Sequence, residues 1–222
     1  MNTLIVHSDE IIGNLIRIPK IRVSQGVSFE LPVSVLGGER FWGRIEDDKG
    51  GIVTISVIRK LLPLERLDVT LIVGLSRPQT IKKVLAVAVQ TGVKKLYFVG
   101  TDRGEKSYSS SNLLKKENLD LEITKSLEQT GDSFSPEIKI YHSLRIFLEE
   151  AETPADKILF IPEGEQVDCI ETPSVLCIGP EAGFSDDELK LMKDFRKVTL
   201  SDRVIRVEFA VAMAIGKVKL KK

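Results

Sequence analysis

A short turn at residues 179–183, with the sequence Gly-Pro-Glu-Ala-Gly, is the part of the chain best suited to bind a small molecule. The apolar run Val175–Ile178 before it predicts a buried strand, and Ser185 with Glu188 three residues later has the spacing of a helix capping box. A turn at the carboxyl end of a parallel strand is where open α/β sheets bind ligands, through free backbone N–H and C=O groups. An ordinary strand–turn–helix connection has the same pattern, so this segment alone leaves both interpretations open.

A second polar turn lies near the C-terminus, where the segment Leu200-Ser-Asp-Arg-Val-Ile-Arg206 leads into a helix predicted over Val207–Val218. That helix is rich in small residues, which allow another stretch of backbone to approach closely. A well-packed terminal helix would be built from the same residues. The small residues are Ala210, Ala212, Ala214 and Gly216.

The composition is that of a globular protein of one large or two small domains, because 42% of the 222 residues are hydrophobic and 29% are charged. No apolar run approaches the roughly 20 residues that cross a bilayer, and the N-terminus lacks the pattern of a signal peptide. Cys169 and Cys177 have no partners at zinc-binding spacing. We therefore expect a cytoplasmic protein with two reduced core thiols and no metal site.

The formal net charge is zero, but the charges are unevenly distributed. Residues 74–116 carry nine basic and two acidic side chains, residues 146–190 carry twelve acidic and two basic ones, and the chain from 193 onward is basic again. This asymmetry permits a basic face that binds nucleic acid, although any single charge fits a solvated helix surface equally well.

Residues 1–68 are predicted to be all β, because short runs rich in Val, Ile and Phe alternate with turns that contain Gly and Asp. Strands of this length and spacing suggest a small barrel. Its aromatic and basic side chains are candidates for RNA contacts, with a core tryptophan and surface arginines as the alternative; they are Trp42, Arg17, Arg22, Arg40 and Arg44. The predicted strands are Ile11–Ile18, Val27–Val35, Arg40–Ile45 and Ile52–Ile58, and Leu61–Leu67 is the predicted linker.

From Val69 onward, strand and helix patterns alternate, which predicts an α/β fold with a mainly parallel sheet covered by helices on both faces. The predicted strands are Val69–Leu75, Lys94–Val99, Ile138–Tyr141, Ile158–Ile161, Val175–Ile178 and Val198–Leu200. The predicted helices begin at Pro78, span Leu113–Gln129 and Ser143–Glu150, begin at Ser185, and span Val207–Val218.

The two turns taken together resemble the RsmE family, whose members methylate N3 of a uridine in small-subunit ribosomal RNA. The resemblance rests on Ile178-Gly-Pro-Glu-Ala-Gly183 and Leu200-Ser-Asp-Arg-Val-Ile-Arg-Val-Glu-Phe-Ala210, with support from Leu75-Ser-Arg-Pro-Gln-Thr-Ile-Lys-Lys83, Val89-Gln-Thr-Gly-Val93 and Glu128-Gln-Thr-Gly131. It implies a homodimeric SPOUT methyltransferase domain at 69–222 with a C-terminal trefoil knot. It also implies a PUA-like, RNA-binding β-barrel at 1–68 and S-adenosylmethionine as the methyl donor.

The resemblance also assigns residues to roles. Those expected to bind the cofactor are Ile161, Pro162, Ile178, Gly179, Pro180, Glu181, Gly183, Leu200, Ser201, Arg203, Val204 and Ile205. Arg206 is the expected catalytic residue, since a guanidinium can stabilise negative charge on the uracil oxygens, and Glu208 either orients Arg206, accepts the proton or forms a structural ion pair. Residues expected to contact RNA are Arg17, Arg22, Lys82, Lys83, Arg103 and Lys106.

Several positions depart from the family pattern, and they keep other functions open. Ala182 and Ser201 replace glycines, and Phe209 replaces a threonine. One alternative is a SPOUT enzyme that methylates another RNA position, such as a tRNA ribose. A second is a non-catalytic RNA-binding factor in ribosome assembly. A third, a nucleotide-binding enzyme that uses residues 179–183 for phosphate, lacks the spacing of both common phosphate-binding loops.

Overall fold

The computed structural model describes residues 3–23 and 29–219, which form two compact units. The first unit contains the chain up to Glu65 together with Ile123–Ser135, and the second contains Arg66–Glu122 and the chain from Pro136 onward. Ile123–Ser135 thus belongs to the same compact unit as the N-terminal residues, although it lies far from them in the sequence.

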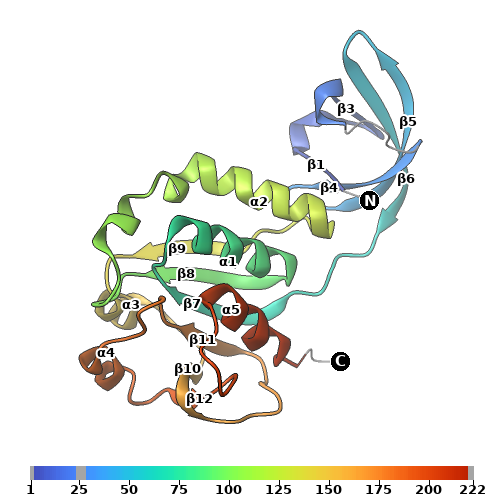
Figure 1. The fold of residues 1–222 in the computed structure, drawn as a ribbon. Helices are drawn as coiled ribbons and strands as arrows, with labels where there is room; N and C mark the ends of the chain where they lie inside the picture. Colours follow the sequence, from blue (N-terminus) through green and yellow to red (C-terminus); the bar gives the residue numbers. More distant parts are fainter. Residues whose placement is uncertain (1–2, 24–28, 220–222) are drawn as a thin grey trace. The chain divides into compact units, whose positions relative to one another are not determined.

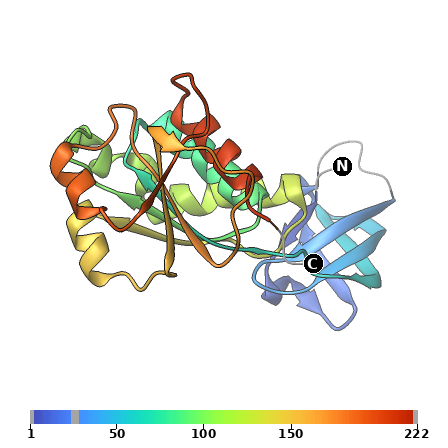
Figure 2. The ribbon, with the colours of Figure 1, turned by 90° about the horizontal axis from the view of Figure 1, so that it is seen from below.

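The first unit is built on a six-stranded sheet with the strand order β1-β4-β5-β6-β3-β2, which curls into a half-barrel (Figure 2). Its neighbouring strands are antiparallel except β1 and β4, which are parallel. The strands are β1 (Leu4–Val6), β2 (Ile11–Ile12), β3 (Leu15–Pro19), β4 (Glu30–Val35), β5 (Arg40–Lys49) and β6 (Ile52–Leu61), with the short 3-10 helices η1 (Ser8–Glu10) and η2 (Lys20–Arg22) between them.

The four strands predicted in this unit are present, with changes at their ends. The stretch Ile11–Ile18 is two strands rather than one, because Gly13 turns the chain with a φ of 62°. The start of the predicted strand Val27–Val35 lies outside the described residues. Strand β1 was not predicted, since three apolar residues are too short a run to indicate a strand.

Residues 123–135 join the first unit through hydrogen bonds to its sheet. The backbone N–H of Thr3 donates to the carbonyl oxygen of Glu128 at 2.8 Å. The carbonyl oxygen of Gly131 accepts from Ser34 Oγ at 3.0 Å and from Arg40 Nε at 2.6 Å. Arg40 therefore has a structural role in the first unit.

The second unit is built on a six-stranded sheet, all of whose neighbouring strands are parallel, in the order β12-β10-β11-β7-β8-β9 (Figure 1). This confirms the predicted α/β architecture of a parallel sheet. The strands are β7 (Leu67–Gly74), β8 (Val93–Val99), β9 (Glu137–Tyr141), β10 (Asp156–Glu165), β11 (Ser174–Ile178) and β12 (Arg196–Val198).

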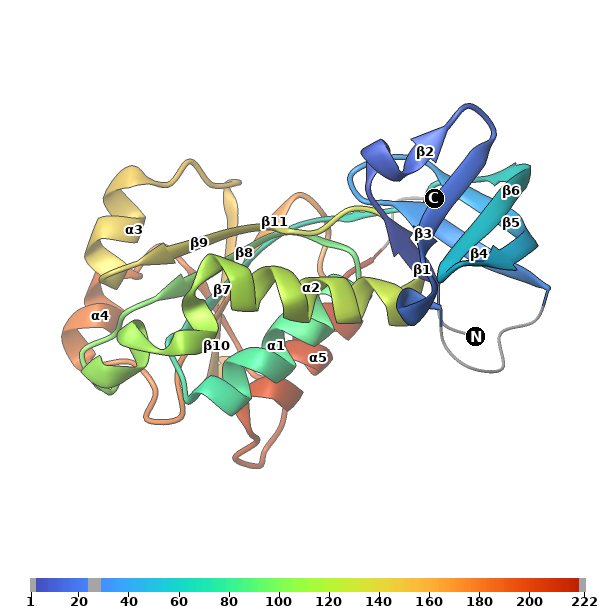
Figure 3. The same ribbon diagram turned by 90° about the horizontal axis from the view of Figure 1, so that it is seen from above.

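Helices cover both faces of this sheet, and α3 lies on the face opposite to α1 and α5 (Figure 3). Because side chains alternate along a strand, Ile72 and Cys177 point to the α3 face, where they pack with Leu144, Phe147 and Met192. The helices are α1 (Pro78–Gln90), α2 (Lys116–Thr130), α3 (Leu144–Glu150), α4 (Asp186–Leu191) and α5 (Val207–Gly216), with the 3-10 helices η3 (Lys106–Ser110) and η4 (Asn112–Leu114) before α2. Residues 123–130 of α2 belong to the first unit.

One prediction about the core is wrong. Cys177 is fully buried, and burial raises the pKa of its thiol, but Cys169 is exposed. Cys169 precedes the buried Ile170, and neighbouring residues of an extended chain point in opposite directions.

Across residues 3–23 and 29–219 no cluster of three or more potential metal ligands occurs. None of the helices in those residues combines the length and apolarity that crossing a bilayer requires.

Candidate functional site

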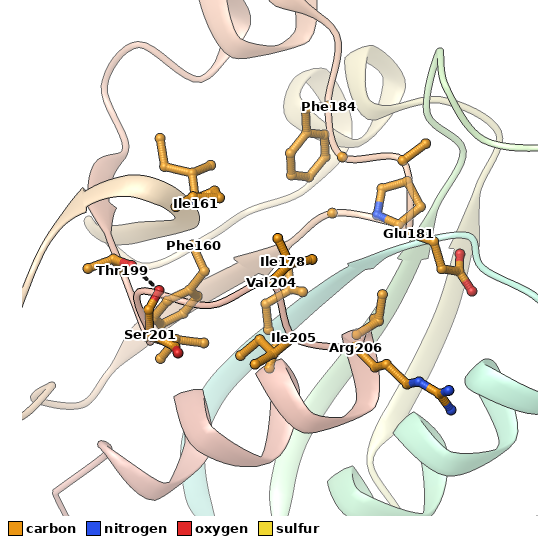
Figure 4. A pocket seen from close by; sticks show the side chains of 18 of the residues that line it. Phe160, Ile161, Ile178, Glu181, Phe184, Thr199, Ser201, Val204, Ile205 and Arg206 are labelled. Atoms are coloured by element: carbon orange, nitrogen blue, oxygen red, sulfur yellow. Dashed lines mark hydrogen bonds between the residues drawn. The ribbon is translucent and has the colours of Figure 1, made fainter.

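A pocket of about 510 Å³ lies at the carboxyl ends of β10 and β11 in the second unit (Figure 4). Three separated segments form it: the end of β10, the turn after β11, and the segment that leads into α5. All twelve residues predicted to bind a cofactor line it. The lining also includes Phe160, Ala182, Phe184, Thr199, Arg206, Val207 and Ala210.

Glycines allow the turn after β11 to approach the sheet closely. A Cβ atom on Gly74, at the end of β7, would lie 2.3 Å from Pro180 Cδ, so only glycine fits there. Gly183 has a φ of 69°, which favours glycine. Ala182 replaces a family glycine without strain, since no described non-glycine residue has a positive φ.

The predicted capping box at the start of α4 is confirmed. The backbone N–H of Ser185 donates to Glu188 Oε2 at 2.8 Å, and that of Glu188 donates to Ser185 Oγ at 3.2 Å. The other carboxylate oxygen of Glu188 accepts from the backbone N–H of Asp102 at 2.9 Å. This buried side chain therefore joins the loop after β8 to the helix that follows the pocket turn.

The third wall of the pocket is a loop stabilised by its own polar side chains. Thr199 Oγ1 donates to the carbonyl oxygen of Ser201 at 3.2 Å, and the backbone N–H of Arg203 donates to Ser201 Oγ at 3.0 Å. Ser201 stands where the family has a glycine, and here its hydroxyl stabilises the turn. This contact was not predicted from the sequence.

The end of β10 passes directly against this third wall. Phe160 and Glu165 both pair with Val198, so residues 161–164 bulge away from the strand. A Cβ atom on Gly164 would lie 2.3 Å from the carbonyl carbon of Val198 and 2.6 Å from the backbone nitrogen of Thr199. Glycine is therefore required for the two segments to cross at this distance.

One end of the pocket is charged. Arg206 and Glu181 both line the pocket, and Figure 4 shows their side chains directed toward the same end, beside α1. Oε1 of Glu181 lies 3.4 Å from both the backbone nitrogen and Nε of Arg77 and accepts a hydrogen bond from Thr80 Oγ1 at 3.1 Å. Burial raises the pKa of Glu181, but these hydrogen bonds outweigh that effect, so its pKa lies below the ordinary value.

Glu208 does not line the pocket. Its Oε1 accepts a hydrogen bond from Lys83 Nζ at 2.9 Å, which joins α5 to α1. Only 8% of Glu208 is exposed, and the hydrogen bond from Lys83 lowers the pKa of the carboxyl group. Of the roles considered from the sequence, the structural ion pair fits this geometry best.

We expect Glu208→Gln to lower the free energy of unfolding by roughly 1 kcal/mol near pH 7, as for a partly exposed ion pair. Because the folded-state pKa is lowered, this contribution is present above the ordinary pKa of 4.5 and is lost as the pH falls through the folded-state value. Urea denaturation at several pH values measures the difference, with the exposed Glu163→Gln as control. A difference that persists unchanged at acidic pH would contradict the assignment.

The predicted RNA-binding residues differ in their immediate neighbours. Three cations of the second unit have acidic neighbours: Lys82 Nζ lies 2.9 Å from Glu122, Lys83 binds Glu208, and a guanidinium nitrogen of Arg103 lies 3.9 Å from Asp186. The fourth, Lys106, begins η3 and is exposed.

The two predicted arginines of the first unit differ from each other. Arg17 is exposed on β3, whereas Arg22 binds the carboxylate of Glu10 and the carbonyl oxygen of Ile5.

Comparison with known proteins gives consistent matches. A family model described as "RNA methyltransferase domain" matches residues 63–219. The curated relatives include ribosomal RNA small subunit methyltransferase E of Treponema pallidum, 28% identical over 65% of this chain and 59% of that protein. They also include ribosomal RNA small subunit methyltransferase E 1 of Borreliella burgdorferi, which is 27% identical over 64% of this chain and 63% of that protein. The matched segments thus span about three fifths of these relatives.

Solved structures resemble this fold along nearly its whole length. One is a ribosomal RNA small subunit methyltransferase E from Neisseria gonorrhoeae bound to S-adenosyl methionine, with a TM-score of 0.78, 18% identity, and coverage of 97% of this chain and 95% of that one. Another is a putative methyltransferase from Legionella pneumophila with bound SAM. Its TM-score is 0.75 at 23% identity, and the match covers 97% of this chain and 96% of that one. Since the family model covers well over half of the sequence, the chain belongs to the family of RNA methyltransferase domains, and the resemblance to the RsmE family is confirmed.

Proposed function

We propose that this protein transfers a methyl group from S-adenosylmethionine to N3 of a uridine in the 16S RNA of the small ribosomal subunit. The observation that carries the proposal is the pocket, in which three separated segments bring together every residue that the family pattern assigns to the cofactor. The names of the curated relatives support the RNA substrate, and the S-adenosyl methionine bound in two similar structures supports the methyl donor.

The pocket suits the adenosine part of such a donor. Its volume is typical of small-molecule sites, and its lining combines apolar side chains with backbone groups of two turns. Ile161, Ile178, Leu200 and Ile205 would pack against the adenine ring, with N–H and C=O groups of the turns around its polar edge. When bound, the donor supplies a methyl group activated by a sulfonium ion.

We assign the catalytic role to Arg206, which lines the pocket. N3 of uracil is a poor nucleophile while it is protonated, and negative charge builds on the ring oxygens as the proton leaves. Arg206 lines the pocket, and its guanidinium forms no hydrogen bond or ion pair with the residues described, although its charge helps to lower the pKa of Glu208. Its N–H donors are therefore available to the uracil oxygens. Because N3 is hidden in a base pair, the target must be unpaired or flipped out.

We infer that the chain also has the trefoil knot and the PUA-like domain of the family. The close crossing at Gly164 and the bridge between Ile170 and Val218 are what a C-terminal trefoil knot would require. The curled sheet of the first unit fits a PUA-like, RNA-binding domain at 1–68, with the methyltransferase domain at 69–222. We also infer a cytoplasmic location, because the proposed substrate is ribosomal RNA.

We propose a homodimer that forms through the exposed side of α5. Val211 and Ala214 of that helix are buried, whereas 59% of Phe209 and 40% of Met213 are exposed to solvent. Phe209 and Met213 are four residues apart and so lie on the same side of the helix. A second copy would cover this apolar strip.

Phe209→Asp should therefore convert dimers to monomers at micromolar concentration, because it places a charge in an apolar interface. Sedimentation velocity measures the change. Leu191→Asp on α4, which is also partly exposed, is the control that should leave the mass unchanged. A Phe209→Asp protein that still sediments as a dimer would exclude this face.

The exposed side chain of Lys106 should contact a phosphate group. Lys106→Gln should make the dependence of log K on log salt less steep by roughly 0.7–0.9, the value for one lost contact. Filter binding to 16S RNA fragments at several salt concentrations measures the slope, with Lys139→Gln on β9 as control. Equal slopes for Lys106→Gln and the wild type would remove Lys106 from the RNA-binding surface.

The proposed function is tested by incubating the protein with labelled S-adenosylmethionine and undermethylated small subunits, followed by mass mapping of the RNA. We expect one N3-methyluridine. Label on a ribose or on transfer RNA would identify a different SPOUT reaction. Absence of donor binding by calorimetry would favour a non-catalytic assembly factor.

A further inference from the structure

The charged end of the pocket has two arginines nearby, and the proposed function uses only Arg206. The second, Arg77, immediately precedes α1 and holds Glu181 through its backbone N–H and its Nε. Glu181 lines the pocket beside Arg206, and Figure 4 shows both side chains reaching toward α1. Arg77 therefore contacts a residue, Glu181, that lines the same pocket as Arg206.

Glu181 is better placed to position Arg77 than to accept a proton. Its Oε1 already accepts from Arg77 and from Thr80 Oγ1, and a carboxylate held in this way is a weak base. The guanidinium of Arg77 uses only its Nε in this contact. With 68% of its side chain exposed, its other N–H donors remain accessible from solvent.

Two cationic donors would suit the uracil acceptor, because its negative charge is shared by two oxygens. In uracil, N3 lies between two carbonyl groups, and the charge of the deprotonated ring is shared by both oxygens. One guanidinium on one side of N3 can stabilise only one of these oxygens closely. A second guanidinium on the other side would stabilise the remaining charge and lower the pKa of N3 further.

We propose that Arg77 is a second catalytic arginine, which binds one carbonyl oxygen of the target uracil while Arg206 binds the other, and that Glu181 positions Arg77. This inference rests on the proposed function. N3 releases its proton to water and forms a bond to the methyl carbon, and the electron pair of the broken carbon–sulfur bond stays on sulfur, which becomes a neutral thioether. Both arginines remain protonated throughout.

The test compares single-turnover rates of the wild type, Arg77→Ala, Arg77→Gln and Glu181→Gln over a range of pH, with undermethylated small subunits as substrate. Arg77→Ala should lower the rate by on the order of 10²-fold near neutral pH, as for the loss of one preorganised donor. Since its loss raises the pKa of N3, the variant should reach its plateau at higher pH than the wild type. Glu181→Gln should also raise the pH at which the rate reaches its plateau, but by less than Arg77→Ala does.

Two measurements separate catalysis from structure. Calorimetry with S-adenosylmethionine should give the same donor affinity for Arg77→Gln as for the wild type, within about twofold, and Arg145→Ala on the opposite face should change neither rate nor profile. A lowered rate with an unchanged pH profile, or a loss of donor binding in both Arg77 variants, would overturn the assignment. If the wild type methylates no RNA, the proposed function fails and this inference fails with it. If the wild type is active, the pH profile and the donor affinity of the Arg77 variants test this inference separately from the proposed function.

Discussion

Arg206→Ala should reduce methyl transfer by on the order of 10²–10³-fold while the protein still binds S-adenosylmethionine. Arg206 lines the pocket, and Glu208, the carboxylate whose pKa its charge helps to lower, keeps its hydrogen bond from Lys83 when Arg206 is removed. The pocket walls built from Gly179–Gly183 and Thr199–Ile205 stay intact. Rates under single-turnover conditions and donor affinity by calorimetry measure the two properties separately.

Two further variants make this result specific to Arg206. Arg206→Lys keeps the charge but loses the planar fork of donors, and it should recover only part of the rate. Arg145→Ala, which removes an exposed arginine from α3, should leave the rate unchanged. Near-full turnover by Arg206→Ala would remove this residue from the mechanism.

Gly164→Ala should destabilise the second unit and abolish donor binding. The added Cβ would meet the backbone of Val198 and Thr199 at 2.3–2.6 Å, and backbone cannot rotate away as a side chain can. Overpacking of this kind costs about 1–3 kcal/mol, and the structure can relieve it only by separating β10 from the third wall of the pocket. Thermal unfolding and calorimetry with S-adenosylmethionine measure both effects.

Gly216→Ala is the matched control, because a Cβ atom on Gly216, at the end of α5, meets nothing within 4 Å. It should raise the free energy of unfolding slightly, since alanine favours helix over glycine by about 1 kcal/mol. If Gly164→Ala binds the donor as tightly as the wild type does, the crossing does not hold the pocket together.

Features encoded locally were predictable from the sequence. The capping box at Ser185 and Glu188 depends on a three-residue spacing, and the buried stripe of α1 follows helical periodicity. The turn at 179–183 was recognisable because glycine and proline limit the conformations available to the chain. The twelve residues expected to bind a cofactor could be grouped in advance, and they all line one pocket, because the family pattern supplied long-range information that no local signal contains.

Contacts between distant side chains were not predictable. Glu181 holds Arg77, Glu188 binds the backbone of Asp102, and Glu208 binds Lys83, and each pair is separated by more than eighty positions. An acidic residue in a sequence shows no preference among the many basic residues and N–H groups of the chain. The partner is decided only when the sheet has brought the strand ends together.

The two hydrogen bonds of Glu188 have a further consequence for how the protein would respond to its ligands. The same carboxylate holds the backbone beside Arg103 and caps the helix that begins after the pocket turn. A shift of that loop when RNA arrives would strain the cap, and a shift of the turn when the donor arrives would strain the loop. Thermodynamic linkage then requires that bound RNA change the affinity for the donor by the same factor as bound donor changes the affinity for RNA. Replacing Glu188 would remove the contact that couples the two sites.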